Sequence, residues 1–364
     1  AKFSFMKEWK KYKLGEILTI KYGKDHKKLE DGPIPVYGSG GLMRSVNSYI
    51  CDTPSILIPR KGSLNNVMYV EHPFWTVDTM FWTIIDTTVA VPRFVYYAIC
   101  KIDFESLNVG SAVPSMTVPI IEDIEIYLPS LDEQNRIVKV LSSLESKIEV
   151  NRQINDNLEQ QAQALYKSWF VDFEPFKDQE FIESELGLMP EGWQCTTLSE
   201  LLSIKYGKDH KKLAEGTIPV YGSGGLMRHV DTKLHEGEAV LIPRKGSLNN
   251  VMYVNKAFWT VDTMFYSIPK LENSCIYAYL FLTNKDLASM NAGSAVPSMT
   301  TDILNNMLII APPAEVLRQF NNICDVYFSR INQNNIENAN LSNQRDTLLP
   351  KLMSEGLKIN EIDC

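Results

Sequence analysis

Residues 20–29 read IKYGKDHKKL, and the same ten residues recur unchanged at 204–213. Three further stretches repeat at the same offset of 184 residues: IPVYGSGGLMR at 34–44 and 218–228, LIPRKGSLNNVMYV at 57–70 and 241–254, and FWTVDTMF at 74–81 and 258–265. A fifth, GSAVPSMT, occupies 110–117 and recurs at 293–300 with an offset of 183. Internal repetition of this kind indicates that one structural module occurs twice in tandem.

The identity between the two copies is patchy. Residues 45–56 and 229–240 have diverged, whereas the polar stretches on either side of them have not. One interpretation is a recent duplication, but that would leave identity everywhere. The other is that particular polar loops stay the same because both copies face the same ligand, and the patchiness favours it.

Bulk composition sets the outer limits. The chain has 364 residues, enough for two domains with sizeable cores. It contains no run of about 18 apolar residues and no signal-peptide pattern at its start, so we expect no membrane span. Its six cysteines are scattered, without a Cys-x-x-Cys pair, which indicates a reducing cytoplasm and no structural metal site.

Two long segments, 131–170 and 314–353, lack glycine and are rich in Gln, Asn, Glu and Leu. Each carries the 4-3 alternation of a heptad seam, which predicts a long helix. The first seam consists of Ile137, Leu141, Leu144, Ile148, Asn151, Asn155, Leu158, Ala162, Leu165 and Trp169. Adding 183 gives the second seam: Phe320, Cys324, Tyr327, Ile331, Asn334, Asn338, Leu341, Arg345, Leu348 and Leu352.

Two asparagines lie at the midpoint of each seam. An antiparallel pairing of the helices would bring Asn151 against Asn338 and Asn155 against Asn334. Buried asparagine in such a seam lowers stability but fixes the register. The aligned asparagine layers therefore favour an antiparallel coiled coil. The alternative is two separate amphipathic helices, each packed on its own domain.

The rest of each copy resembles a mixed α/β domain. Short β-like runs at 57–59 and 67–70, punctuated by Gly, Pro and Asn turns, precede an aromatic-rich helix at 93–99, and the second copy has a matching helix at 276–282. The predicted fold class is α+β: two mixed α/β domains, each followed by a long helix, with pseudo-two-fold symmetry. The expected boundaries are 1–129 and 176–312 for the domains, 130–175 for the central helix, and 313–364 for the C-terminal helix and tail.

The repeated loops are basic although the chain is acidic. The net charge is −8, yet residues 20–70 hold seven Lys or Arg against four Asp or Glu, and residues 204–254 hold eight against five. Such loops suit phosphate contacts. The candidates are Lys21, Tyr22, Lys24, His26, Lys27 and Lys28, with Lys205, Tyr206, Lys208, His210, Lys211 and Lys212. A lone charge run is usually a solvated face, but unchanged duplication favours phosphate binding.

Further repeated loops offer groups that could read DNA. Arginine can bridge guanine O6 and N7, and asparagine can bridge adenine N6 and N7. The candidates are Ser39, Arg44, Arg60, Lys61, Ser63, Asn65, Asn66 and Ser115, with Ser223, Arg228, Arg244, Lys245, Ser247, Asn249, Asn250 and Ser298. The alternative for the RKGSLNN stretch is a β-turn whose asparagines fill left-handed positions.

Catalytic motifs are missing from the sequence. There is no Gly-x-Ser-x-Gly, no His-Glu-x-x-His, no nucleotide-binding glycine pattern and no adenine-methylation motif. We therefore expect a chain without catalytic residues, metal or cofactor. If DNA is methylated or cleaved, another chain must supply that chemistry.

The ends of the two helical segments resemble a known family. Residues 165–176 read LYKSWFVDFEPF and residues 345–354 read RDTLLPKLMS. These are similar to the central and C-terminal conserved regions of the specificity (S) subunit of Type I restriction–modification enzymes. The openings Trp9-x4-Leu14 and PEGW-x4-Leu198, with the Pro-Ser-Met loops, resemble its target-recognition domains. The resemblance covers the chain almost end to end.

The resemblance implies a non-catalytic, sequence-specific subunit that binds double-stranded DNA at a bipartite site. Each recognition domain would read one half of the site, while the helices fix the spacer and dock two methyltransferase (M) subunits. S-adenosylmethionine would be bound by those M subunits, and two restriction (R) subunits could join the assembly. Adenine methylation or cleavage would be the work of these partners.

The identical reading loops depart from the commonest family pattern, in which the two recognition domains differ. They suggest a palindromic target, namely a half-site, a nonspecific spacer and the reverse complement. The seam spans about 33 residues, or roughly 50 Å, which is compatible with half-site centres about one DNA turn apart. The competing functions are a scaffold that grips two identical protein partners and a stand-alone DNA enzyme with an unrecognised site.

Overall fold

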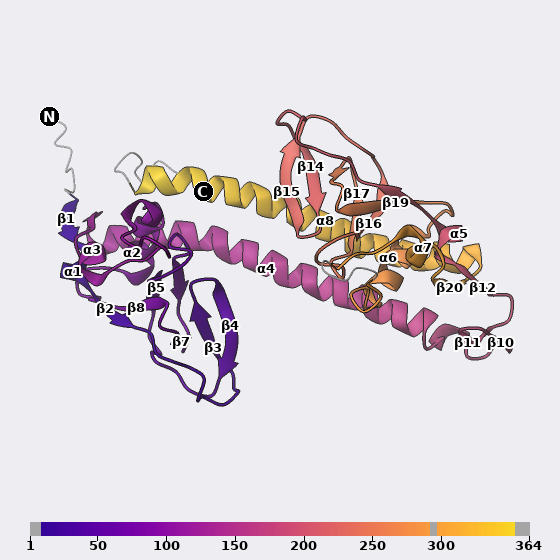
Figure 1. The fold of residues 1–364 in the computed structure, drawn as a ribbon, viewed down its shortest axis with the longest axis horizontal. Helices are drawn as coiled ribbons and strands as arrows, with labels where there is room; N and C mark the ends of the chain where they lie inside the picture. The colour runs from indigo at the N-terminus through magenta and orange to yellow at the C-terminus, as the bar shows by residue number, and fades with distance from the viewer. Residues whose placement is uncertain (1–8, 292–296, 354–364) are drawn as a thin grey trace. The chain divides into compact units, whose positions relative to one another are not determined.

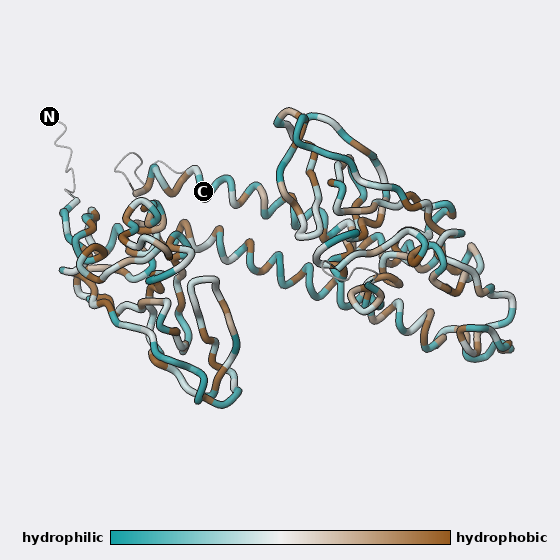
Figure 2. The backbone as a smooth tube through the Cα atoms, viewed as in Figure 1, coloured by the Kyte–Doolittle hydropathy of each residue, from teal (hydrophilic) through white to brown (hydrophobic). Residues whose placement is uncertain are grey.

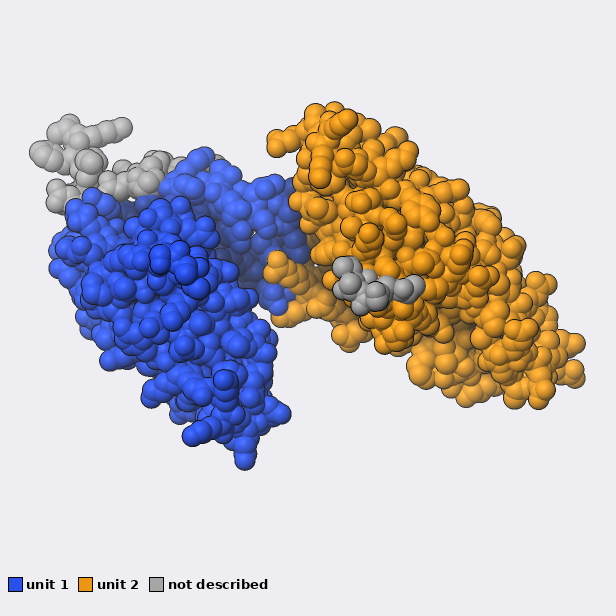
Figure 3. All heavy atoms as spheres, viewed as in Figure 1, with its two compact units in different colours: residues 1–150, 337–364 blue, residues 151–336 orange. Residues whose placement is uncertain are grey.

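The computed structural model describes residues 9–291 and 297–353. The chain forms two compact units, one made of residues 1–150 and 337–364 and the other of residues 151–336 (Figures 1 and 3). The start of the second GSAVPSMT repeat, residues 293–296, lies outside the described residues. Each unit contains one copy of the repeated module together with parts of both long helices.

In the first unit, the central sheet is four-stranded and antiparallel. Its order is β2 (Leu18–Tyr22), β8 (Met80–Ile85), β5 (Ser55–Pro59) and β6 (Met68–Val70). A three-stranded sheet has the order β4 (Gly41–Val46), β3 (Ile34–Gly38) and β7 (Trp75–Thr76), and β1 (Lys10–Lys13) pairs with β9 (Glu125–Leu128). The helices of this module are α1 (Leu14–Ile17), α2 (Pro92–Ile99) and α3 (Val118–Glu122).

The second unit repeats this topology. The four-stranded sheet has the order β13 (Leu202–Tyr206), β19 (Met264–Pro269), β16 (Glu238–Pro243) and β17 (Met252–Asn255). The three-stranded sheet is β15 (Gly225–Val230), β14 (Ile218–Gly222) and β18 (Trp259–Thr260), and β12 (Gln194–Thr197) pairs with β20 (Leu308–Ala311). The helices are α5 (Leu198–Leu201), α6 (Cys275–Thr283) and α7 (Thr301–Asn305), and an extra hairpin joins β10 (Phe181–Ser184) to β11 (Gly187–Pro190).

The mixed α/β architecture with two equivalent modules confirms the predicted fold class. The expected strands at 57–59 and 67–70 correspond to β5 and β6, and the expected helices correspond to α2 and α6. β5 is buried along its whole length because the central sheet is covered there, so its run of apolar residues lacks the alternation of a one-sided strand. No helix in the described part of the chain is long and apolar enough to cross a membrane.

The long helices are α4 (Leu131–Phe170) and α8 (Ala314–Leu352), within one residue of the glycine-free segments 131–170 and 314–353. Acidic residues in the first turn and a lysine in the last turn of each helix complement the helix dipole. Figure 2 shows hydrophilic residues along both helices, interrupted at intervals by hydrophobic ones. All the seam positions named above are buried or half-buried, as the heptad pattern predicts.

Within the second unit, the segments of α4 and α8 contact each other. The ring centroids of Trp169 and Phe320 lie 5.8 Å apart, and the Asn334 side-chain amide donates to Asn155 Oδ1 at 2.8 Å. Residue numbers fall along α4 as they rise along α8, so these segments run antiparallel. Both contacts belong to the register that the heptad analysis favours. In the first unit, Lys147 pairs with Glu337 at 3.6 Å.

Each helix segment also packs on its own module. Phe170 of α4 meets Tyr277 of α6 at 4.6 Å and Phe320 of α8 at 4.8 Å between ring centroids. A tyrosine hydroxyl ties each module to α4: Tyr97 donates to Glu145 at 2.6 Å, and Tyr279 donates to Glu159. Burial, reinforced by the neighbouring carboxylate, raises the pKa of both phenols, so they stay protonated as donors.

We predict that Phe320→Ala destabilises the second unit by about 3–5 kcal/mol, because it removes a fully buried ring from the junction of two helices and a module. The measurement is the midpoint of urea unfolding, followed by tryptophan fluorescence. The control is Val326→Ala on the same helix, whose side chain is 66% exposed and should change stability by less than about 0.5 kcal/mol. Equal shifts for the two variants would contradict the assigned packing.

Candidate nucleic-acid interface

The RKGSLNN loop follows β5 and is fixed by its backbone to two neighbouring segments. The Arg60 amide donates to the Thr79 carbonyl at 2.8 Å, and the Gly62 amide donates to the Pro114 carbonyl at 3.0 Å. The Met116 amide in turn donates to the Arg60 carbonyl at 2.9 Å. The corresponding bonds in the second unit are 2.8, 3.2 and 2.8 Å long. The predicted loop residues and the Pro-Ser-Met loop therefore form one surface in each unit.

The arginine of this loop has a fixed position. The Arg60 guanidinium lies over the Tyr22 ring at 5.3 Å from its centroid, and Nη1 donates to the Asp78 carbonyl at 3.2 Å. The second unit repeats these contacts at 5.4 and 3.1 Å with Arg244, Tyr206 and Asp262. The Asp78 bond uses one of the five N–H donors of a guanidinium. The arginine is half-buried, so its reach is set by its partners rather than by free rotation.

The asparagines of the same loop support its conformation. Asn66 donates to the Ser39 carbonyl at 2.8 Å, while Asn65 donates to Asp103 at 3.0 Å and accepts from the Glu105 amide at 3.3 Å. The second unit repeats this pattern with Asn250 and Asn249. A bidentate bond to adenine needs both the oxygen and the nitrogen of the amide. These contacts give Asn65 and Asn249 a part in supporting the loop, although no asparagine of the RKGSLNN stretches adopts the left-handed conformation that the alternative interpretation required.

Glycine is required at one position of this loop. Gly62 has a φ of +88°, and a Cβ there would lie 2.9 Å from Ser39 Oγ. Gly246 has the same φ and the same approach to Ser223. The turn between β3 and β4 therefore packs tightly against the RKGSLNN loop. This approach explains why Ser39 and Ser223, predicted as ligand contacts, are only half-exposed.

The lysine-rich loop after β2 presents most of its charges to solvent. Lys21, Lys24, Lys27 and Lys28 are exposed, and so are their four counterparts in the second unit. The loop backbone is held by the Trp75 indole, which donates to the Lys24 carbonyl at 2.9 Å. His26 and His210 are half-buried. The loop thus combines a fixed main chain with exposed ammonium groups, as a phosphate-binding surface requires.

Two groups in and beside this loop have structural roles. Arg44 donates to the Leu29 carbonyl at 3.1 Å and to Asp31 at 2.7 Å, and Arg228 donates to the Leu213 carbonyl at 2.7 Å. These bonds close the loop, and both half-buried arginines remain predicted DNA contacts. Backbone hydrogen bonds from Lys27 and Lys211 lower the pKa of the Asp25 and Asp209 carboxyls, which stay ionised between the lysines.

The remaining candidates fall into three groups. Lys61, Ser63, Lys245 and Ser247 are exposed on the RKGSLNN loops. Ser115 and Ser298 face these loops through backbone bridges to Lys61 and Lys245. Asn151, Asn155, Asn334 and Asn338 lie on α4 and α8, away from the loops, and Asn334 is buried.

The sequence analysis missed an apolar feature of the repeated hairpin. Leu42, Met43, Leu226 and Met227 are large hydrophobic side chains that are more than half exposed. They belong to the unchanged IPVYGSGGLMR stretch, from which only the polar residues had been selected. The available signal was the pair of apolar residues directly after a glycine turn.

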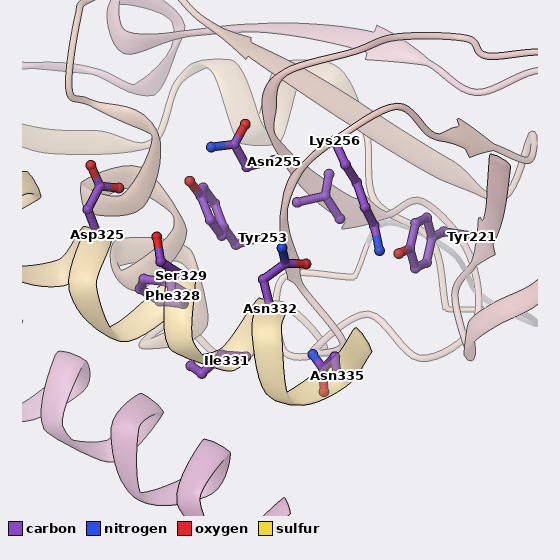
Figure 4. A pocket seen from close by; sticks show the side chains of 11 residues that line it. Tyr221, Tyr253, Asn255, Lys256, Asp325, Phe328, Ser329, Ile331, Asn332 and Asn335 are labelled. Atoms are coloured by element: carbon purple, nitrogen blue, oxygen red, sulfur yellow. The ribbon is translucent and has the colours of Figure 1, made fainter. Parts of the chain in front are cut away.

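A pocket in the second unit is lined partly by residues of the repeated stretches and partly by residues outside them. It lies between the end of β17 and α8 and is lined by residues that include Tyr221, Lys256, Asp325 and Asn332 (Figure 4). The first copy carries His72 at the position of Lys256. The two copies therefore differ in part of the lining of this pocket. Among the described residues, no group of His, Cys, Asp or Glu side chains is placed to hold a metal ion.

We predict that Gly62→Ala displaces the RKGSLNN loop at a cost of about 1–3 kcal/mol, because alanine at φ +88° is strained and crowds Ser39. Hydrogen exchange of residues 60–66 should speed up. The matched control is Gly40→Ala in the adjacent turn, where an added Cβ meets nothing within 4 Å. Unchanged exchange in Gly62→Ala would contradict the close packing of turn and loop.

Comparison with known proteins gives a family match over most of the chain. The model of the Type I restriction modification DNA specificity domain matches residues 6–160 and again residues 190–342. The Type I restriction enzyme MjaIX specificity subunit of Methanocaldococcus jannaschii is 26% identical over 340 residues, covering 85% of this chain and 78% of that protein. The HindI specificity subunit of Haemophilus influenzae is 24% identical over 326 residues, covering 66% and 71%.

A solved structure shares the fold. The crystal structure of the S subunit of a Type I restriction–modification system from M. genitalium superimposes with a TM-score of 0.63 at 18% identity. The alignment covers 97% of this chain and 98% of that one.

Proposed function

The chain belongs to the Type I restriction modification DNA specificity family, and we propose that its two modules each read one half of a split, palindromic DNA site. Members of this family are the specificity subunits of restriction–modification systems, which recognise DNA and do not catalyse its modification. The proposal concerns the symmetry of the site, the residues that read it and the composition of the complex.

The observation that carries the proposal is the equivalence of the two interfaces. The arginine–tyrosine stacks differ by only 0.1 Å between the two units, with centroid distances of 5.3 and 5.4 Å. The supporting asparagine bonds and the glycine conformations are repeated as well. Two identical reading surfaces favour identical half-sites, since direct readout depends on which donors and acceptors face each base.

The geometry supports a division of roles within each interface. Arg60 and Arg244 are held in place and suit bidentate bonding to guanine, which a planar guanidinium makes well. The exposed lysines at 21, 24, 27 and 28, with their counterparts, suit phosphate contacts, which carry affinity but no sequence information. Serines 63, 115, 247 and 298, which lie on or beside the arginine loop, would add further contacts. The asparagines and Arg44 keep the loops in shape.

The complex we propose contains double-stranded DNA, two methyltransferase subunits that bind S-adenosylmethionine, and two restriction subunits where the system cleaves DNA. Modules at 1–129 and 176–312 would each bind one half-site. The helical segments at 130–175 and 313–364 would pair along their length as a coiled coil, with Asn151, Asn155, Asn334 and Asn338 fixing the register. The assembly would act in the cytoplasm, on the DNA it modifies.

The proposal is tested by co-expressing the chain with its M subunit and sequencing the methylated DNA by a single-molecule method. We expect a split motif with self-complementary halves and modified adenine on both strands. A split motif with unrelated halves would keep the family function but contradict the symmetry. Absence of modification, with the same M subunit active beside another S subunit, would contradict the function itself.

We predict that Arg60→Ala relaxes base preference in one half-motif only, and that Arg244→Ala relaxes the other half. Loss of one bidentate contact costs about 1–3 kcal/mol of discrimination against the wrong base. The measurement is again the methylated motif, now for each single variant. Relaxation of both halves by either variant would show that the arginines do not each read one half-site.

We predict that Lys27→Ala combined with Lys211→Ala weakens binding to all sequences equally. The plot of log affinity against log salt concentration should become less steep by about 1 per lysine removed. Each lysine that contacts a phosphate displaces counterions from the DNA, and the variant displaces fewer of them. Lys177→Ala, an exposed lysine outside the repeated loops, serves as the control and should leave the slope unchanged. A changed base preference in the double variant would contradict the division of roles.

A further inference from the structure

The repeated β-hairpins carry an exposed apolar pair. Leu42 is 65% exposed and Met43 is 55% exposed, and their counterparts Leu226 and Met227 are 57% and 55% exposed. Single exposed hydrophobic residues are ordinary, but adjacent ones at equivalent places in two units indicate an interaction site. The pair is unchanged between copies, whereas Ser45 just beyond it is replaced by a histidine in the second copy.

The hairpin tip is open on one side and fixed on the other. Gly41 has a φ of +110°, and a Cβ at Gly40 or Gly41 would meet nothing within 4 Å. The neighbouring Ser39 accepts a hydrogen bond from Asn66 and lies against Gly62, as described above. Figure 1 shows both hairpins, β3–β4 and β14–β15, standing out from the rest of their units. The tip of the hairpin is thus open to solvent at Gly40 and Gly41, while Ser39 fixes it to the RKGSLNN loop.

The apolar pair lies between the two basic loops. On one side, Ser39 joins the hairpin to the loop that carries Arg60. On the other side, Arg44 joins it to the lysine-rich loop through the Leu29 carbonyl. A ligand that reaches Leu42 therefore also meets exposed positive charge. This setting matches duplex DNA, whose phosphates surround groove edges that carry apolar groups.

The side chains of Leu42 and Met43 differ in exposure and in how closely they pack on the backbone. Met43 lies across the backbone, since a Cβ at Gly38 would come within 2.6 Å of its sulfur, and Met227 lies across Gly222 at 2.5 Å. Leu42 is the more exposed of the two, and it lies opposite Tyr37 in the register of the hairpin. Leu42 is therefore the side chain that is freer to meet a ligand.

We propose that Leu42 and Leu226 read thymine, each by contact with the C5-methyl group in the major groove beside the base contacted by the arginine. This inference rests on the proposed function, because it requires DNA at these loops. The methyl of thymine is the one apolar group on a base edge, and apolar side chains discriminate it by contact. Each interface would then combine an arginine for guanine with a leucine for thymine.

The test is binding of the chain, in complex with its M subunit, to fluorescent duplexes that contain the methylated motif. Thymines of the half-sites are replaced by deoxyuridine, which removes only the methyl group. We expect the wild-type complex to lose about fourfold in affinity for each methyl removed, the equivalent of one buried methylene. The variant Leu42→Ala with Leu226→Ala should bind the thymine duplex more weakly and should not respond to deoxyuridine.

The control variant is Leu188→Ala, whose side chain is 61% exposed on β11 outside the repeats, and it should respond like the wild type. An equal response to deoxyuridine in the double variant and the wild type would overturn the proposal, as would a wild type insensitive to deoxyuridine. In both cases, specific binding of the thymine duplex would leave the proposed function standing. A wild-type complex with no preference for its own motif would overturn both.

Discussion

The aromatic packing around Phe170 is the contact on which the second unit depends. Its ring meets Tyr277 of α6, Phe320 of α8 and Trp193 ahead of β12, with centroid distances between 4.6 and 5.9 Å. One side chain therefore joins the end of a long helix to its partner helix and to the sheet-bearing module. In the first unit, Ile137 and Leu141 of α4 share a core with Phe94 of α2 and Leu352 of α8. Each module is thus held by apolar residues from both helices, and Leu64 and Leu248 of the RKGSLNN loops are buried in the same cores.

The arginine and lysine loops of both modules are held in a fixed conformation by contacts within their own units. Ordering long cationic side chains on binding costs conformational entropy. A loop whose backbone must also become ordered on binding loses further conformational entropy. Here the arginine lies on a tyrosine, the asparagines hold the backbone, and a tryptophan indole fixes the lysine loop. Positive charge is concentrated in the two repeated regions, since both are basic while the chain as a whole carries a net charge of −8.

The polar side chains that the sequence identified as candidates for DNA contact fall into two groups. Some are free to bind, and others also support the loops. Asn65 and Arg44 had the right groups to contact DNA, but their donors bond to carboxylates and carbonyls of their own unit. A polar residue in an unchanged repeat satisfies either demand, since the need to shape a loop preserves residues as strictly as the need to bind. Leu42, in contrast, was not among the residues selected from the sequence, although the fold exposes its side chain.

The sequence by itself determined the large features of this protein. Duplication of long stretches predicted two equivalent modules, and the heptad pattern predicted the bounds and the buried seams of α4 and α8. These features follow from local periodicity, which any helix or strand must obey. Only the tertiary structure decided which loop residues face solvent. Contacts such as Asn66 to Ser39, 27 residues apart in the chain, depend on how the hairpin folds back over the loop. No sequence pattern within a single stretch predicts that the hairpin packs against the loop. The different surroundings of Arg60, Arg44 and Leu42 can therefore be distinguished only in the folded chain.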